Sequence, residues 1–489
     1  MIDFLNIEKY KENNRIEAKK ALGGLPRSIW ETYSAFANAL GGVLLLGVEE
    51  HKDKSLHPVN LPDPERLIKE FWSIINNPVR VNTNILSEKD VYTLEVNGNH
   101  IIVINVPRAQ RVDKPIFIDN NPLTGTYRRN GEGDYRCSVE EVQAMQRDAE
   151  IKTQDMAVLE EMSLDALDFD CIRRYRYRMK KVRPGHRWEK LKDVDFLEKL
   201  GAVSRVSKEN TSKDVILEEI HPTAAGLLMF GYEYEIVKEF PSFFLDYQEQ
   251  MGEDDEITHR IVSSYGDWSG NICDFYFRVH DRRVESMHIE DINNVEAVHN
   301  ALREAVANSI INADYYGNCG IEIIKSKNMI TISNPGSFRI DVNEALSGGK
   351  SDPRNAAIIK MFTMVNVSEN TGSGIPNIYR VWKKQGWKEP VIREFFEPEE
   401  IILMLPLEKD DSKRLLIKRK SSSIKRQMSS PIEEIIEYLT ENISATSSEL
   451  AVYLGMNSLQ IKNILSKMIE MDIVDVKGNS RNKAYKMKE

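Results

Sequence analysis

Two polar residues with complementary chemistry lie four positions apart in the segment NALREAVANSIINADYYGN, residues 300–318. If the segment is helical, Glu304 and Asn308 project from one face. A carboxylate can orient or deprotonate the water that attacks a phosphate, and an amide oxygen can bind the accompanying Mg²⁺. The spacing predicts a nucleotide-hydrolysing site, whereas the simpler interpretation of such a pair is ordinary helix surface.

A glycine-rich turn follows in the segment SENTGSGIPNIYRVW, just before a second predicted helix. Glycines let backbone N–H groups approach phosphate oxygens, and a helix N-terminus adds a favourable field. Before this turn come a strand that ends in Asn334-Pro335-Gly336 and the loop SGGKSDPRN at 347–355. The order of these segments favours nucleotide binding at the turn residues Gly372, Ser373 and Gly374.

In this arrangement residues 221–407 resemble the GHKL ATPase superfamily, and more narrowly the divergent ATPase domain of bacterial proteins labelled as related to the RecG helicase. The resemblance implies a Bergerat-type α/β sandwich that binds ATP and Mg²⁺, with Glu304 as general base and Asn308 as metal ligand. Loop 347–355 would be the lid. Asn334 stands where the superfamily has an adenine-reading Asp, and its amide can pair with adenine as a neutral group. The other implied nucleotide contacts are Gly336, Gly372, Ser373 and Gly374.

Near the N-terminus, the segments YKENNRIEAKK (10–20) and YSAFANALGGVLLLGVEE (33–50) resemble the Schlafen AlbA-like domain. The resemblance extends to about residue 136 and implies association with nucleic acid, RNA or DNA. The animal Schlafen members that cut RNA imply a catalytic role for Glu12, Glu17 and Glu50. Such carboxylates bind Mg²⁺ or Mn²⁺ and support phosphodiester cleavage. Glu50 stands where the animal enzymes have Asp, and the structural alternative pairs Glu17 with Lys19 or Lys20.

The elements that must position these residues follow from the apolar periodicity. In the N-terminal part we expect a helix over 28–40, then a buried strand in VLLLGV, and then a hairpin of VYTLEV and HIIVINV around Asn97-Gly98. Ser138 and Glu141 predict a capping box at the start of a helix.

Farther along, we expect charged and mostly helical sequence over 146–215, a helix in HPTAAGLLMFG, and strands in FPSFFLDYQE and NICDFYFRV. A helix over 295–312, the strand pair IEIIKSKNMITISNPG and the strand IILMLPL (401–407) complete this part. The basic stretch 171–192 is either a phosphate-binding surface or a solvated helix face.

The C-terminal segment 431–489 resembles a winged helix, with SLQIKNILSKMIEM as the recognition helix and a wing from Ile473 to Tyr485. Polar side chains on the recognition helix can meet base edges, and basic residues in the wing can meet phosphates. Docking of another protein is the alternative use of such a domain. The candidate base contacts are Ser458, Gln460, Asn463 and Lys467.

The fold class is therefore multidomain α/β and α+β. The predicted parts are a Schlafen AlbA-like domain (1–145), a helical connector (146–220), a GHKL-like ATP-binding domain (221–407), a basic flexible linker (408–430) and a winged helix (431–489).

Composition narrows the function classes. The chain has a formal charge of −10, is 41% hydrophobic, and has four widely spaced cysteines, which argues against a zinc cluster or a disulfide framework. Its apolar runs fall short of the ~20 residues that a membrane helix needs. We expect a cytoplasmic homo-oligomer without membrane association.

The sequence as a whole predicts an ATP-binding and weakly ATP-hydrolysing protein that acts on nucleic acid. In this interpretation it is a nuclease effector in stress or phage defence. The alternative is an ATP-sensing transcription regulator that binds DNA through the winged helix and has no enzymatic activity.

Overall fold

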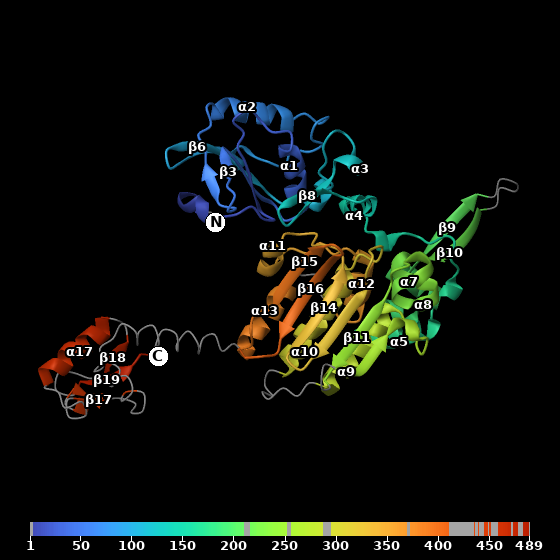
Figure 1. Cartoon of the computed structure of the whole chain (residues 1–489). Helices are drawn as coiled ribbons and strands as arrows, with labels where there is room; N and C mark the ends of the chain where they lie inside the picture. Colours follow the sequence, from blue (N-terminus) through green and yellow to red (C-terminus); the bar gives the residue numbers. More distant parts are fainter. Residues whose placement is uncertain are drawn as a thin grey trace. The chain divides into compact units, whose positions relative to one another are not determined.

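The computed structural model divides the chain into two compact units, Met1–Glu408 and Lys409–Glu489 (Figure 1). It describes residues 3–209, 216–251, 256–286, 295–368 and 372–409 of the first unit and its junction with the second. In the second unit it describes 458–470, 473–477, 483–488 and a few positions between 435 and 450.

The N-terminal part is built on a four-stranded sheet with the order β1-β2-β6-β5, in which β1 and β2 run parallel and the other neighbours antiparallel. Apolar side chains of the two main helices cover one face of this sheet. The predicted helix, buried strand and hairpin are confirmed. The elements are β1 (Ile16–Lys19), α1 (Ile29–Asn38), β2 (Gly42–Leu46), α2 (Pro64–Ile75), β5 (Val91–Val96) and β6 (Asn99–Val106).

Smaller elements surround this sheet and lead out of the domain. The predicted capping box is present, because Ser138 Oγ accepts from Glu141 N and the Glu141 carboxylate accepts from Ser138 N. These elements are η1 (Phe4–Lys9), β3 (Val48–Glu50), β4 (Leu56–Pro58), η2 (Glu88–Asp90), η3 (Arg111–Asp113), α3 (Pro122–Gly125), β7 (Tyr127–Asn130), β8 (Gly133–Arg136) and α4 (Val139–Ala149).

A six-stranded sheet with the order β12-β11-β13-β14-β16-β15 forms the centre of the rest of the first unit. Strands β11 and β13 are parallel, and the other neighbours are antiparallel. Helix α10 contacts α9, α13 and strand β14, so it lies against the middle of the sheet (Figure 1). The elements are β11 (Leu245–Gln250), β12 (Ile257–Val262), α9 (Ile272–Ser286), α10 (Val295–Asn312), β13 (Ile321–Ser326), β14 (Met329–Pro335), α13 (Gly374–Gln385), β15 (Val391–Phe396) and β16 (Glu399–Pro406).

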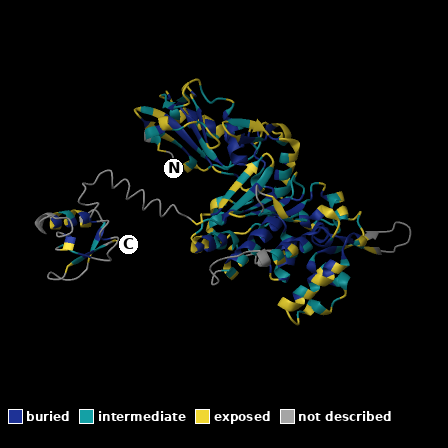
Figure 2. Ribbon diagram, turned by 60° about the horizontal axis from the view of Figure 1, so that its bottom comes forward, coloured by how far each residue is buried: buried dark blue, intermediate teal, exposed yellow. Residues whose placement is uncertain are grey.

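One hydrophobic core joins this sheet to the helices that precede it in the chain, as the dark blue interior in Figure 2 illustrates. It includes Tyr175 and Leu200 from the expected connector as well as Leu405 from the last strand. The remaining elements are η4 (Gln154–Met156), η5 (Leu164–Ala166), α5 (Phe169–Val182), η6 (Arg187–Lys190), α6 (Asp193–Leu200), β9 (Val203–Glu209), β10 (Ile216–Pro222), α7 (Ala224–Phe230), α8 (Glu233–Glu239), η8 (Ser263–Tyr265), α11 (Val342–Ser347) and α12 (Ala356–Met364).

One expectation about this region is wrong. The segment NICDFYFRV is not a strand but the start of α9, because Asn271 Oδ1 accepts from Asp274 N and caps a helix. Its buried residues Ile272, Phe275, Tyr276 and Val279 have the spacing of one helical face. Residues 203–209, expected within mostly helical sequence, form β9, which pairs with β10.

In the second unit, α17 (Ser458–Glu470) is followed by a hairpin of β18 (Val474–Lys477) and β19 (Ala484–Met487). β17 (Ala445–Thr446) adds a third strand beside β19. These elements occupy the places predicted for the recognition helix and the wing. The winged-helix resemblance also implies helices in the segments IEEIIEYL and SSELAVYLG. Most of these two segments, and the predicted linker beyond Lys409, lie outside the described residues.

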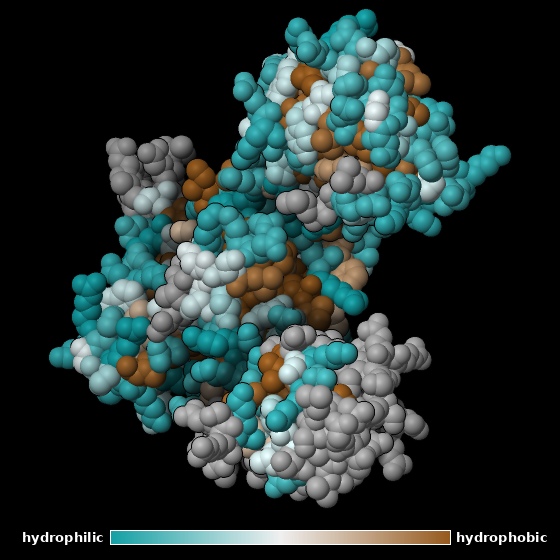
Figure 3. Space-filling model, turned by 90° about the vertical axis from the view of Figure 1, so that its left-hand side faces the viewer, coloured by the Kyte–Doolittle hydropathy of each residue, from teal (hydrophilic) through white to brown (hydrophobic). Residues whose placement is uncertain are grey.

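Hydrophilic residues alternate with small hydrophobic areas on the face shown in Figure 3. Among the described residues, none of the helices is both long and apolar enough to cross a membrane.

Candidate functional site

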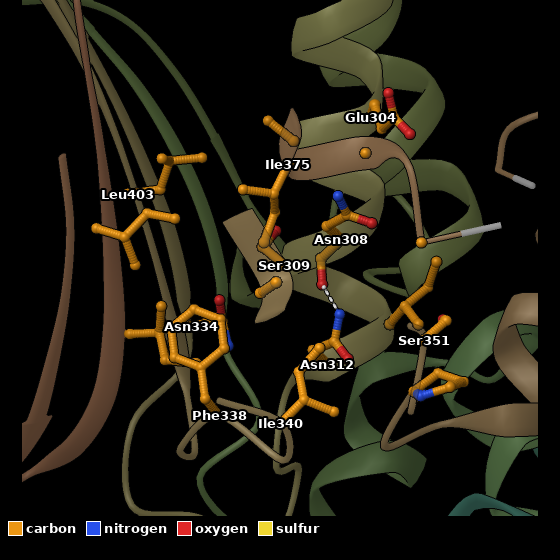
Figure 4. A pocket seen from close by; sticks show the side chains of 18 of the residues that line it. Glu304, Asn308, Ser309, Asn312, Asn334, Phe338, Ile340, Ser351, Ile375 and Leu403 are labelled. Carbon is orange, nitrogen blue, oxygen red and sulfur yellow. Dashed lines mark hydrogen bonds between the residues drawn. The ribbon is translucent and has the colours of Figure 1, made fainter. Parts of the chain in front are cut away.

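A cavity of about 150 Å³ lies between α10, the strands β14, β15 and β16, the loop 347–355 and the N-terminus of α13 (Figure 4). One end is polar and the other is apolar. The polar lining includes Glu304, Asn308, Asn312, Lys350, Ser351 and Asp352, and the apolar lining includes Ile332, Phe338, Ile340, Ile375, Ile392, Ile401 and Leu403.

At the polar end, α13 begins directly against the two residues singled out on α10. A β-carbon at Gly374 would lie 2.7 Å from Asn308 Nδ2 and 2.8 Å from Glu304 Oε1. Asn377 Nδ2 donates to Glu304 Oε2 at 3.2 Å. With no β-carbon at Gly374, the helix N-terminus with its outward N–H groups lies beside a carboxylate and an amide.

The loop 347–355 packs on the glycine turn. Gly372 has a φ of +65°, and a β-carbon there would lie 2.4 Å from Lys350 O. Gly349 N donates to Gly372 O at 3.2 Å. Ser373 occupies the N-cap position of α13, between Gly372 and the first helical residue, Gly374. The expected lid and the expected phosphate turn are thus direct neighbours.

At the apolar end, Asn334 on β14 is buried and lines the cavity. Its Nδ2 donates to Pro335 O at 3.2 Å, so the amide is fixed in orientation. Gly336 is not among the lining residues. A β-carbon there would lie 2.0 Å from Arg354 Nη1, so this glycine makes room for a buried arginine.

Sequence reasoning missed several lining residues. Asn312 follows Asn308 by one helical turn and donates from Nδ2 to Asn308 O at 3.0 Å (Figure 4). Its spacing from Asn308 was a usable signal. Phe338 and Ile340 line the apolar end from a loop, and loop spacing gives no such signal.

The three N-terminal carboxylates have different surroundings. Glu12 Oε1 accepts from Ala18 N at 3.0 Å. Burial raises the pKa of Glu12, and repulsion from Glu17 and Glu50 raises it further. Glu17 is held by Arg129 Nη2 at 2.6 Å and by Lys19 Nζ at 2.5 Å. Glu50 Oε1 is buried without a hydrogen-bond partner.

The ligand atoms of these three carboxylates do not all lie within 4.8 Å of one another. Among the described residues, the trio whose ligand atoms all lie within 4.8 Å is Asp168, Cys171 and Asp274, not the three glutamates. Two cations already neutralise Glu17. The structural alternative for Glu17, a pair with Lys19, is what the contacts show.

The trio on α5 and α9 has structural partners. Asp168 Oδ1 accepts from Cys171 N and caps α5, while Arg174 Nη2 pairs with Asp274 Oδ2 at 2.6 Å. Capping and ion pairing therefore account for both carboxylates.

Much of the basic stretch 171–192 is also engaged within the fold. Arg174 pairs with Asp274, Arg176 Nη1 lies 2.6 Å from Asp193 Oδ1, and Lys180 Nζ lies 2.6 Å from Glu189 Oε1. Arg183 Nη2 donates to Thr363 O at 2.9 Å. These contacts favour a structural use over a phosphate-binding surface.

The fold and the cavity define a mixed α/β multidomain protein in which an ATPase-like domain follows a smaller N-terminal domain. The family models agree. "Schlafen, AlbA_2" matches residues 12–138, and "Putative ATP-dependent DNA helicase recG C-terminal" matches residues 318–403. A domain of unknown function (DUF8451) matches residues 143–246. The N-terminal part of the chain therefore holds a Schlafen AlbA_2 domain. The second match covers Asn334 and the glycine turn but begins after Glu304 and Asn308.

Solved structures that are similar to this chain include the following two. The N-terminal domain of a putative ATP-dependent DNA helicase RecG-related protein from Nitrosomonas europaea is 31% identical, covers 28% of this chain and 95% of its own, and has a TM-score of 0.23. The DIP2311 protein from Corynebacterium diphtheriae is 14% identical, covers 97% of this chain and 95% of its own, and has a TM-score of 0.39. A search of curated proteins found no match.

Proposed function

We propose that this protein binds ATP with Mg²⁺ in the cavity beside α10, hydrolyses it, and thereby regulates an action on nucleic acid. The observation that carries the proposal is that the N-terminus of α13, at Gly374, lies against Glu304 and Asn308 in one cavity, so that backbone N–H groups, a carboxylate and an amide come together there. The match to an ATPase-like family and the order of the lining elements support it.

The residues at the polar end fit a nucleotide phosphate and its metal. Mg²⁺ prefers oxygen ligands and neutralises phosphate charge, and Asn308 would hold it through its side-chain oxygen. The N–H groups at the start of α13 would bind phosphate oxygens. Glu304, oriented by Asn377, would accept a proton from the attacking water.

The apolar end fits a purine base. Ile332, Phe338 and Leu403 offer apolar surface, and Asn334 offers one fixed amide. A neutral amide can form hydrogen bonds with adenine, but without the charge of an Asp these are weaker. We therefore propose ATP as the ligand, with looser discrimination among bases than a carboxylate would give.

Replacing the proposed base separates catalysis from binding. Glu304→Ala should lower ATP turnover by about 10²-fold or more, because a general base contributes on that order. Affinity for ATP should stay within about tenfold, since the base acts mainly in the transition state. Turnover is measured by phosphate release and affinity by calorimetry with the non-hydrolysable analogue AMP-PNP. Glu296→Ala, an exposed glutamate on the same helix, is the matched control. Wild-type turnover in Glu304→Ala would reject the assignment.

The nucleic-acid partner is proposed from the Schlafen AlbA_2 domain and from the winged-helix resemblance of the second unit. Nuclease chemistry would need the N-terminal carboxylates, of which Glu50 keeps a buried unpaired oxygen. A regulator without nuclease activity is the second candidate, favoured by the cations that hold Glu17. The two candidates differ in Mn²⁺-dependent cleavage of RNA or single-stranded DNA.

A further inference from the structure

Arg111 connects the N-terminal domain to the loop 347–355. It lies on η3, and its Nε donates to the carboxylate of Asp352, a residue that lines the cavity. Its Nη1 donates to Asp148 O at 2.8 Å and to Glu150 O at 3.0 Å, at the C-terminal end of α4. One guanidinium therefore ties the lid to the end of the helix that leaves the N-terminal domain.

Arg354, at the end of the same loop, completes this connection from the other side. Its guanidinium donates to both carboxylate oxygens of Asp148, at 2.5 and 2.8 Å. It also donates to Asn312 O at 2.7 Å and to Ser337 O at 3.0 Å, and both of these residues line the cavity. The lid, α4 and the cavity wall thus share one hydrogen-bonded network.

A second arginine of the N-terminal domain anchors another wall of the cavity. Arg108 binds Glu394 on β15 through two bonds of 2.5 and 2.8 Å, and its Nη2 donates to Phe338 O at 2.7 Å. Phe338 N in turn donates to Glu394 Oε1 at 2.8 Å. This arrangement fixes the Phe338 backbone from outside the ATPase-like domain.

The two contacts differ in burial. The side chains of Arg108 and Glu394 are 9% and 3% exposed, whereas those of Arg111 and Asp352 are 18% and 29% exposed. Breaking a buried bidentate pair is costly, and breaking a more exposed pair costs less. The buried Arg108–Glu394 pair is thus suited to a permanent contact. The more exposed Arg111–Asp352 pair is suited to a contact that breaks and forms when the loop 347–355 moves.

We propose that Arg111 is a positioning residue for the nucleotide site, supplied by the N-terminal domain, and that its pair with Asp352 couples nucleotide occupancy to the state of that domain. The inference rests on the proposed function, because the coupled ligand is ATP. If a nucleotide shifts the lid, it must change this pair. By linkage, a ligand on the N-terminal domain that changes the pair then alters nucleotide affinity by the same factor.

The test uses the full chain and AMP-PNP. Asp352→Asn removes the charge of the lid side chain but leaves the Arg111 contacts to α4 in place. Calorimetry should show AMP-PNP affinity altered by about fivefold or more, the lower end of typical coupling between sites. In the wild type, AMP-PNP should change amide hydrogen exchange over residues 108–114, and Asp352→Asn should lose that response. A residue with only a structural role would not make exchange in the N-terminal domain depend on nucleotide.

The matched control is Asp119→Asn, which removes the Arg80–Asp119 pair elsewhere on the same domain and should change neither readout. The double variant Arg111→Asp with Asp352→Arg should recover much of the exchange response if the pair itself transmits it. Asp352→Asn with wild-type affinity and exchange response would overturn the coupling alone. Absence of AMP-PNP binding by the wild type would instead overturn the proposed function on which it rests.

Discussion

Lys114 illustrates how single residues set the properties of the contact between the N-terminal and ATPase-like parts. Its Nζ donates to Asn38 O at 2.9 Å. Loss of hydration lowers the pKa of Lys114 to about 7, and repulsion from Arg108 and Arg128 contributes. The pKa of Lys114 is lower in the folded chain than in the unfolded chain. Loss of its proton therefore stabilises the folded chain relative to the unfolded one.

This shift predicts a pH dependence of stability. Between about pH 7 and the unfolded lysine pKa of about 10.4, the unfolded chain holds a proton that the folded chain has released. Lys114 therefore makes the free energy of unfolding rise with pH through this window. Below about pH 7 the buried lysine is charged, and it lowers the free energy of unfolding by its full amount. Lys114→Met should remove this rise.

Urea unfolding of wild type and variant from pH 6.5 to 9.5 measures the effect, because the other titrating groups cancel in the difference. Parallel pH profiles for the two proteins would contradict the prediction.

At the scale of elements, helix α1 shows why the segment SAFAN has two polar residues, Ser34 and Asn38, in a buried helix. Ser34 and Asn38 are buried on this helix, and Ser34 Oγ donates to Ile116 O at 2.7 Å. Asn38 Nδ2 donates to Ile116 O at 2.7 Å and to Tyr127 O at 3.1 Å, and Asn38 Oδ1 accepts from Ile116 N at 2.8 Å. These side chains satisfy backbone groups of two distant segments, as buried polar groups require.

Asn38→Ala should therefore lower the free energy of unfolding of the first unit by about 3 kcal/mol or more, because each buried backbone group left without a partner costs about 1–3 kcal/mol. Chemical denaturation measures the change. Asn99→Ala is the control, since its amide makes one long contact of 3.4 Å with Asn97 O, and it should cost much less. Equal losses in both variants would show that the network adds little.

At the scale of the whole molecule, the chain divides after Glu408. A protein that ends at Glu408 keeps the four-stranded sheet and the six-stranded sheet. It also keeps the cavity and the arginines that bind the cavity walls. We expect it to fold and to bind AMP-PNP within about threefold of the full chain, because compact domains keep their own cores.

The same truncation should reduce binding of double-stranded DNA if the second unit is a winged helix that contacts DNA. Circular dichroism, calorimetry and a DNA mobility-shift assay measure the three outcomes. Loss of nucleotide binding on truncation would mean that the second unit contributes to the site.

The sequence by itself determined the elements whose signals are local. The periodicity of 28–40 and 295–312 predicted helices, Asn97-Gly98 predicted a hairpin, and Ser138 with Glu141 predicted a capping box. The four-residue spacing of Glu304 and Asn308 placed both on one helical face. Helices, turns and caps form between residues close in the chain, so their geometry follows from spacing.

Only the tertiary structure decided which distant groups meet. Gly374 lies beside Glu304 and Asn308 across about seventy residues of chain, and Arg129 reaches Glu17 from 112 positions away. The strand expected at Ile272 became a helix, because its apolar residues pack into a core built from separate segments. Such contacts depend on how elements pack, and packing selects among partners that have no fixed separation in the sequence.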